Sequence, residues 1–255
     1  MGAKTCIGTT DTRVSTPHAD ITDEDRQFVL DNINALMDLP QPLTASDIIA
    51  ERCGVRPLAV KGDSGTADWL ALSRKHAIDQ NTEDAYLSIY GGKLTDCLNV
   101  GEEVAAALQD CGIDLPHLQQ PWYGEPPDAV RDEFFHQAEL MQLDAMTDER
   151  ASEPLSQRLW RRYGLNAIEL LDQIRQDPRQ AEILIQHSEY LRCELHYVAE
   201  KEIVTKLEDF LRRRSKISQV VRRETIENSP GLLEACQILF GDQAEARLQE
   251  WQSCK

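Results

Sequence analysis

LSQRLWRRYGLNAIELLDQI, at residues 155–174, decides the fold of the second half of the chain. Apolar residues recur every three or four positions on both sides of Gly164, which predicts two amphipathic helices, 155–163 and 166–174, hinged at the glycine. The same periodicity runs through residues 189–214 and predicts the longest helix of the chain. Its core-facing side chains are expected to be Leu191, Leu195, Val198, Leu207, Phe210 and Leu211. Residues 151–255 are therefore predicted to form an all-α domain.

The sequence before residue 115 mixes strand-like and helix-like stretches. A helix is expected to begin at Thr22, because Thr22 and Asp25 form a capping box ahead of apolar residues at helical spacing. Further helices are expected at residues 44–52 and 95–111, and strands at residues 5–12, 54–60, 74–80 and 85–90. Four prolines between residues 113 and 130 indicate an extended connection. We therefore expect a mixed module over residues 1–115, a linker over 116–150, and an α+β fold class overall.

Composition excludes several classes of protein. Of the 255 residues 41% are hydrophobic and 28% are charged, as in an ordinary globular chain. The net charge of −17 disfavours binding to nucleic acid, whose phosphates carry the same sign. Seven cysteines without a CxxC pair predict reduced, mostly buried thiols rather than a disulfide framework or a zinc site. No signal peptide or membrane-spanning run is recognisable, so the default location is the cytoplasm.

Three short motifs each carry a functional and a structural interpretation. GDSG at residues 62–65 is found in serine proteases, but the upstream sequence is helical rather than all-β, which favours a surface loop. Cys193, His196 and Glu200 could share a metal-binding helix face, although pairs at this spacing are common on surfaces. The basic run between residues 212 and 223 either complements a helix dipole or contacts anionic lipid or an acidic partner.

The stretch YGGKLTDCLNV, at residues 90–100, joins two glycines and a lysine to the start of a predicted helix. Backbone amides at such a helix start attract anions. Together with Arg56 and Arg74, which lie near predicted strand ends, Lys93 suggests a site for a small anion such as phosphate. Arginines paired with carboxylates on strands are an equally valid interpretation of the same pattern.

These residues give the chain a specific resemblance. It resembles the C-terminal half of FAD-dependent, quinone-linked (aerobic) glycerol-3-phosphate dehydrogenase. The motifs that carry the resemblance, in chain order, are IGTTDT (7–12), AERCGVRPL (50–58), LSRKH (72–76), YGGKLTD (90–96), WRRYGLNAIELL (160–171) and CELHYVAEKEIVTKLEDFLRRRS (193–215).

The resemblance implies roles for individual residues. Arg56 and Arg74 match the family's arginines that grip the substrate phosphate. Lys93 matches the catalytic lysine beside the flavin and the substrate oxygen, where a cation would stabilise developing negative charge. Flavin contacts are implied for Gly91, Gly92, Lys93, Leu94 and Thr95. The implied reaction is oxidation of sn-glycerol 3-phosphate to dihydroxyacetone phosphate, with electrons passed to quinone; no metal is implied.

The family's pyrophosphate-binding GxGxxG unit is not found among the thirteen glycines. We therefore expect a partial substrate-domain sheet and the last βα element of an FAD-binding fold, with an FAD site that is incomplete and inactive without a separate N-terminal half. Peripheral attachment to the inner membrane and a homodimer both remain open. The alternatives are an oxidase that reduces oxygen and a non-catalytic remnant whose helical domain binds a partner or membrane.

Overall fold

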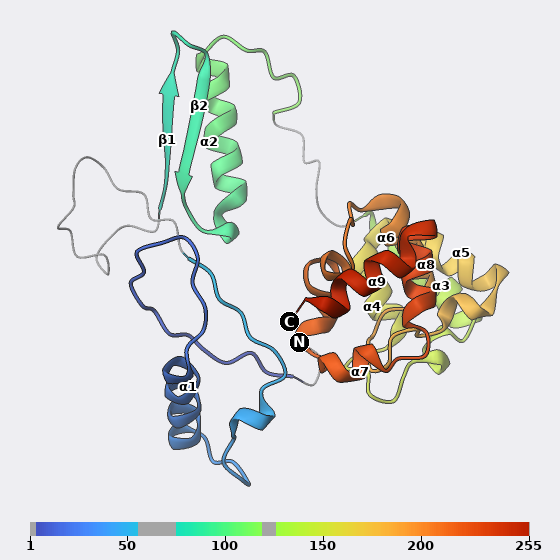
Figure 1. Cartoon of the computed structure of the whole chain (residues 1–255). Coiled ribbons are helices and arrows are strands. Elements are labelled where there is room, and N and C mark those ends of the chain that lie inside the picture. The colour runs from blue at the N-terminus through green and yellow to red at the C-terminus, as the bar shows by residue number, and fades with distance from the viewer. Residues whose placement is uncertain (1–3, 56–74, 119–125, 255) are drawn as a thin grey trace. The chain divides into compact units, whose positions relative to one another are not determined.

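The computed structural model describes residues 4–55, 75–118 and 126–254, and its fold class is α+β, as predicted. The described residues form two compact units (Figure 1). The first contains residues 4–12, 21–52 and 126–254, and the second contains residues 13–20, 53–55 and 75–118.

A β-hairpin with one helix against it makes up most of the second unit (Figure 1). Strand β1 (His76–Asn81) pairs antiparallel with β2 (Tyr86–Gly91), in a register that sets His76 opposite Gly91. A 3-10 turn, η3 (Leu94–Asp96), then leads into α2 (Cys97–Asp110). β1, β2 and α2 thus correspond to the predicted strands 74–80 and 85–90 and the predicted helix 95–111, apart from Arg74, which lies outside the described residues.

Residues 4–55 contain one helix, α1 (Asp23–Leu36). Its capping box is the predicted one, since the Thr22 hydroxyl accepts from the Asp25 amide at 3.1 Å and the Asp25 carboxylate accepts from the Thr22 amide at 3.1 Å. The helix expected at residues 44–52 is only a 3-10 turn, η1 (Ala45–Asp47). Residues 5–12 form no strand. Of the expected strand 54–60 the structure describes only residues 54 and 55, and the GDSG loop at residues 62–65 lies outside the described residues.

Residues 126–254 fold into a helical bundle (Figure 1). Its α-helices are α3 (Asp128–Leu140), α4 (Leu155–Tyr163), α5 (Ala167–Gln176), α6 (Arg192–Lys201), α7 (Arg223–Glu227), α8 (Leu232–Phe240) and α9 (Ala244–Ser253). The short turns are η4 (Leu143–Met146), η5 (Gly164–Asn166), η6 (Pro178–Ala181), the π-helix η7 (Asp209–Arg214), η8 (Ile217–Gln219) and η9 (Gly241–Gln243). Gly164 ends α4 with φ +51°, which makes it the predicted hinge between α4 and α5.

Two hydrophobic cores hold this bundle together. One is centred on α3, α4 and α5 and contains Phe134, Leu159 and Leu171. The other joins α6, η7, α8 and α9 and contains Leu195, Phe210 and Trp251. All six side chains that periodicity assigned to the core between residues 189 and 214 are at most 2% exposed.

The expected linker at residues 116–150 contains folded structure in its second half. Phe134 of α3 and Leu143 of η4 are fully buried in the bundle. Asp144 accepts from the Ser156 amide at 2.8 Å and Thr147 accepts from the Leu155 amide at 3.0 Å, so residues of this segment cap α4. The prolines that suggested a linker lie before α3, and the helical pattern that follows them belongs to the bundle.

The expectation of one continuous helix over residues 189–214, which rests on apolar periodicity, is also wrong. The helix is broken after Lys201 and resumes near Leu207, continuing as the π-helix η7. The break coincides with the β-branched run Ile203-Val204-Thr205, whose side chains are restricted in helices. The Asp209 carboxylate stabilises this break, because it accepts from the Thr205 hydroxyl at 3.0 Å and from the Thr205 amide at 3.1 Å. The side chain thereby takes an amide that a continuous helix would use for its own hydrogen bonding.

Burial differs sharply between the parts of the chain. Every buried hydrophobic side chain of the described residues lies at or after Phe134. Before that point large apolar side chains are exposed, among them Leu36 (79%), Phe28 (57%) and Leu94 (90%). None of the described helices is long and apolar enough to cross a membrane.

All seven cysteines are free thiols, but the expectation that most are buried is wrong. Only Cys193 and Cys236 are buried. Burial raises the pKa of the Cys236 thiol to about 11 and raises that of Cys193 further.

Candidate functional site

The predicted flavin-contacting residues form a sharp corner between β2 and α2. Gly91 and Gly92 have φ values of +65° and +87°, which glycine adopts without strain. Lys93 then precedes the turn η3, and its carbonyl accepts from the Asp96 amide at 2.9 Å. The amides of Leu94 and Thr95 precede the first hydrogen bond of the turn, as the first amides of a helix do. All five residues from Gly91 to Thr95 are exposed.

The local structure also explains why position 92 is a glycine. A Cβ atom at Gly92 would lie 3.0 Å from the Cβ of His76 on the neighbouring strand. A side chain there would therefore be strained both by the backbone conformation and by this contact. Leu94 is 90% exposed, so its side chain offers apolar surface at the corner.

His76 ties this corner to α2, a feature that sequence patterns did not reveal. Its Nδ1 lies 2.9 Å from Asp96 Oδ2 and its Nε2 lies 2.9 Å from Glu103 Oε2. The imidazole is only 11% exposed. Hydrogen bonds to Glu103 and Asp96 raise the pKa of His76. The Asp96 carboxylate also accepts from Asn99 at 2.7 Å, and this bond, His76 and the nearby charge of Lys93 lower the pKa of Asp96.

Arg56 and Arg74, the two predicted phosphate ligands, lie outside the described residues. The structure therefore places the Lys93 part of the predicted site and is silent on the arginines. In the sequence, one residue separates Arg74 from His76, the first residue of β1.

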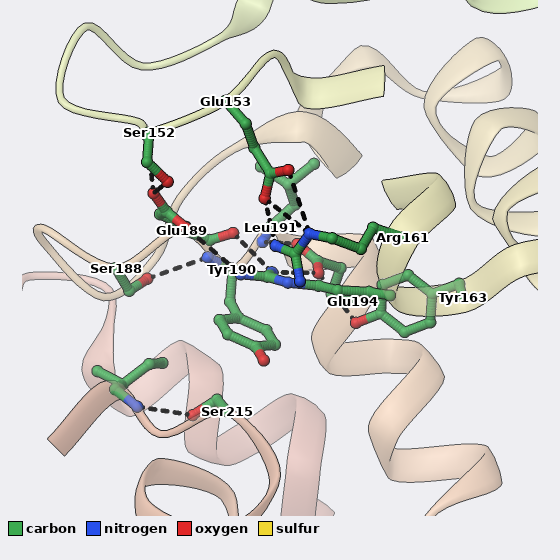
Figure 2. Close-up of polar contacts among 12 residues, drawn as sticks. Ser152, Glu153, Arg161, Tyr163, Ser188, Glu189, Tyr190, Leu191, Glu194 and Ser215 are labelled. Carbon is green, nitrogen blue, oxygen red and sulfur yellow. Dashed lines mark hydrogen bonds and ion pairs between the residues drawn. The ribbon is translucent and has the colours of Figure 1, made fainter. Parts of the chain in front are cut away.

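A second polar cluster lies inside the helical bundle and joins two of the quoted motifs (Figure 2). Glu194 of α6 is fully buried. Its Oε1 accepts from Arg162 Nη1 at 2.8 Å and from the Tyr163 hydroxyl at 2.9 Å, and its Oε2 accepts from the Leu191 amide at 2.8 Å. The Arg162 guanidinium also stacks on Tyr190, 4.0 Å from the ring centroid. Burial and the charge of Glu194 raise the pKa of the Tyr163 hydroxyl, which keeps it a neutral donor.

This cluster gives the polar residues of the two helical motifs a structural role. WRRYG contributes Arg162 and Tyr163, and CELHY contributes Glu194. The only hint in the sequence was a glutamate between Leu191 and Leu195, both of which face the core. Arg158, one turn before Arg162, is 1% exposed, and its Nε and Nη1 have no hydrogen-bond partner among the described residues. Burial lowers the pKa of Arg158.

The suggested metal-binding helix face and the basic run between residues 212 and 223 can both be compared with the structure. Within the described residues no three His, Cys, Asp or Glu side chains converge as a metal site would require, and Cys193 is buried away from solvent. In the basic run, Arg213 pairs with Asp209 at 2.9 Å. Arg214 lies 3.3 Å from Glu202, and Arg223 pairs with Glu227 at 2.7 Å and stacks on Trp251. The run is therefore not a bare cationic surface.

Known proteins match the chain in both halves. Residues 128–246 match the family described as the C-terminal domain of alpha-glycerophosphate oxidase. The chain is 30% identical over 225 residues to a glycerol-3-phosphate dehydrogenase of Pseudomonas aeruginosa, which covers 84% of this chain and 41% of the relative. It is 31% identical over 222 residues to glycerol-3-phosphate dehydrogenase 2 of Mycobacterium tuberculosis, covering 85% of this chain and 36% of the relative.

A mitochondrial glycerol-3-phosphate dehydrogenase of Macaca fascicularis is 33% identical over 104 residues, which is 40% of this chain and 14% of the relative. No solved structure matches the chain. The chain spans about two fifths of the length of the bacterial relatives that it matches along most of its own length, 41% and 36% in the two cases.

Proposed function

From the relationship of this chain to the C-terminal part of the glycerol-3-phosphate dehydrogenases, we propose that it forms one wall of an FAD-dependent active site. The enzyme to which this wall belongs oxidises sn-glycerol 3-phosphate to dihydroxyacetone phosphate. The wall is the corner from Gly91 to Thr95. The electron acceptor in this proposal is a membrane quinone.

The observation that supports this proposal best is the geometry of the corner. Two glycines in positive-φ conformations turn the chain so that Lys93 and the first amides of η3 stand together on an exposed edge. The exposed Leu94 side chain supplies apolar surface beside them. A flavin ring needs both, since it has flat apolar faces and a rim of polar atoms. The residues present therefore fit FAD, and Gly91, Gly92, Lys93, Leu94 and Thr95 would hold it.

The chemistry assigned to this chain is electrostatic. When bound, FAD would supply the acceptor for the hydride that leaves C2 of the substrate, while the proton of the C2 hydroxyl is released to solvent. The Lys93 ammonium would stand beside the substrate oxygen and stabilise the negative charge that develops on it, and electrostatic stabilisation of this kind is usually the largest single contribution to catalysis. Arg56 and Arg74 would bind the phosphate of glycerol 3-phosphate, because guanidinium groups pair with phosphate in a bidentate manner.

A separate N-terminal FAD-binding half is part of the proposal. Hydrophobic side chains exposed before residue 126, including Phe28, Leu36 and Leu94, offer apolar surface that such a half could contact. The chain also has no GxGxxG unit for the FAD pyrophosphate. We therefore expect the 255-residue chain to retain FAD poorly and to show no turnover by itself.

Two alternatives remain distinct from this proposal. The name of the matching C-terminal domain family, alpha-glycerophosphate oxidase, favours an enzyme that reduces oxygen. Consumption of oxygen with release of hydrogen peroxide, against reduction of a soluble quinone, separates the two acceptors. A non-catalytic module that binds membrane through the basic run is less well supported, because Arg213, Arg214 and Arg223 are paired with carboxylates.

The first test uses the chain as it is. The purified protein is incubated with FAD, dialysed, and examined for flavin absorbance and for turnover of sn-glycerol 3-phosphate with an artificial electron acceptor. We expect neither. Turnover by the chain alone would contradict the proposed need for a second half.

The second test supplies the missing half. A chimera joins the part of the Pseudomonas aeruginosa relative that precedes the aligned region to this chain, and retained flavin absorbance reports its assembly. We expect glycerol 3-phosphate oxidation, a loss of about 10²–10³ in kcat for Lys93→Ala, and a raised KM for Arg56→Ala. Lys201→Ala removes an exposed lysine of α6 and is the matched control. A flavin-loaded chimera without turnover, or Lys93→Ala no slower than Lys201→Ala, would refute the proposed role of the corner.

A further inference from the structure

The geometry points to His76 as a positioning residue for the proposed site: we propose that its imidazolium clamps Asp96 and Glu103 and thereby fixes the corner that presents Lys93. This inference rests on the proposed function for its catalytic consequence. The clamp itself is a local feature of the second unit.

Both ring nitrogens of His76 face carboxylate oxygens at hydrogen-bonding distance, 2.9 Å in each case. An ionised carboxylate only accepts hydrogen bonds, and a neutral imidazole has a single N–H donor. Both contacts can be satisfied together only when the ring carries two protons. The arrangement therefore selects the charged form of His76, and neutralising the ring breaks one of the two bonds.

The clamp reaches Lys93 through Asp96. The Asp96 carboxylate accepts from His76, while the Asp96 amide donates to the Lys93 carbonyl at 2.9 Å. The other end of the ring holds Glu103, almost two turns along α2. On the opposite side, His76 is the register partner of Gly91, and its Cβ closes the space above Gly92. One side chain thus contacts the strand, the glycines and the helix that together define the corner.

The charged groups acting on the ring are the two carboxylates, with Lys93 close enough to lower the pKa of Asp96. Since the pKa of His76 is raised by its partners, the clamp stabilises the corner below the ordinary histidine value near 6.5 and is lost as pH rises through the higher value of the folded state. The corner should therefore be most rigid in mildly acidic solution and loosen at higher pH.

The clamp is tested on the 255-residue chain without flavin. NMR titration of the His76 ring should give a midpoint above the ordinary histidine value of about 6.5. Hydrogen exchange at the Asp96 amide, corrected for its intrinsic pH dependence, should be slow below that midpoint and faster above it. His76→Gln should speed this exchange at low pH and abolish its pH dependence. Asp96→Asn and Glu103→Gln should each lower the His76 midpoint, and His117→Gln should change nothing.

A His76 midpoint no higher than the ordinary histidine value of about 6.5, or Asp96 exchange unaffected by His76→Gln, would overturn the inference. Glu103→Gln guards against a His76 variant that fails to fold, because it leaves the imidazole in place and shifts only its titration. In an active chimera, His76→Gln should lower kcat and alter its pH profile with little change in KM. A flavin-loaded but inactive chimera would count against the proposed function alone, whereas an active chimera indifferent to His76→Gln would count against the clamp alone.

Discussion

Glu194→Ala should be among the most destabilising single substitutions in the helical bundle. Glu194 is fully buried and satisfies three donors, from Arg162, Tyr163 and the Leu191 amide. Its removal leaves a guanidinium that is only 16% exposed without its main partner. Breaking a buried pair in this way costs about 3–5 kcal/mol, because the remaining charge stays desolvated. The unpaired hydroxyl and amide add to the same cost.

This free energy corresponds to a measurable shift in melting temperature. For a bundle of about 130 residues the unfolding entropy is about 0.27 kcal/mol/K, so a loss of about 4 kcal/mol lowers Tm by about 15 °C. Urea denaturation followed by circular dichroism at 222 nm gives the free energy directly, since the bundle supplies most of the helix. Tyr163→Phe, which removes one donor of the three, should cost about 1.5–3 kcal/mol.

The matched control is Glu153→Ala, which removes a glutamate from the neighbouring but more exposed pair with Arg161 (Figure 2). Exposed pairs contribute little, so a cost below about 1 kcal/mol is expected. A cost for Glu194→Ala no greater than that for Glu153→Ala would refute the view that the two helical motifs meet in a structural network.

Four further outcomes follow from burial and backbone geometry. Phe134→Ala should cost about 3–5 kcal/mol by urea denaturation, because Phe134 is fully buried in the bundle, whereas a linker residue would cost almost nothing. Arg158→Met should leave stability unchanged or raise it, since two buried donors no longer lack partners; a loss above about 1 kcal/mol would show that Arg158 has a stabilising partner. Gly92→Ala should destabilise the hairpin by about 1–2 kcal/mol, because Gly92 has φ +87°, and local hydrogen exchange measures this. A thiol reagent at pH 8 should label five cysteines quickly and leave Cys193 and Cys236 protected until the bundle unfolds.

Local signals in the sequence were sufficient for the elements that local interactions build. The capping box at Thr22 and the hinge at Gly164 depend on neighbours within a few positions, and the hairpin of residues 76–91 pairs residues at most 15 positions apart. The six core positions of residues 189–214 were identified although the helix is broken, because each half keeps its own apolar face. The prediction of a strand at residues 5–12 was wrong, because a strand needs a pairing partner, which no local sequence pattern specifies.

In the candidate site too, contacts between sequence neighbours could be predicted and contacts between distant residues could not. The corner around Lys93 was visible as consecutive residues, whereas the His76 contacts join residues 20 and 27 positions apart and required the fold of the hairpin onto α2. The Glu194 network likewise joins residues separated by 31 and 32 positions. The resemblance identified the motifs that contain Arg162, Tyr163 and Glu194 but assigned these residues no role. Because residues 116–150 were expected to be a linker, the sequence did not indicate that α3 belongs to the core of the bundle.

The two groups of motifs should therefore fail in different ways when altered. Arg162 and Tyr163 both donate to the buried Glu194 carboxylate. Variants of these three residues should therefore lower the amount of folded protein while the surviving molecules keep their rate. Lys93 is exposed at the corner and its neighbours are held by His76, so its loss should spare the fold and act on the proposed reaction. Measuring kcat per folded, flavin-loaded chimera separates the two. A Glu194 variant that slowed each folded molecule would mean that the bundle takes part in the chemistry and is more than a support for it.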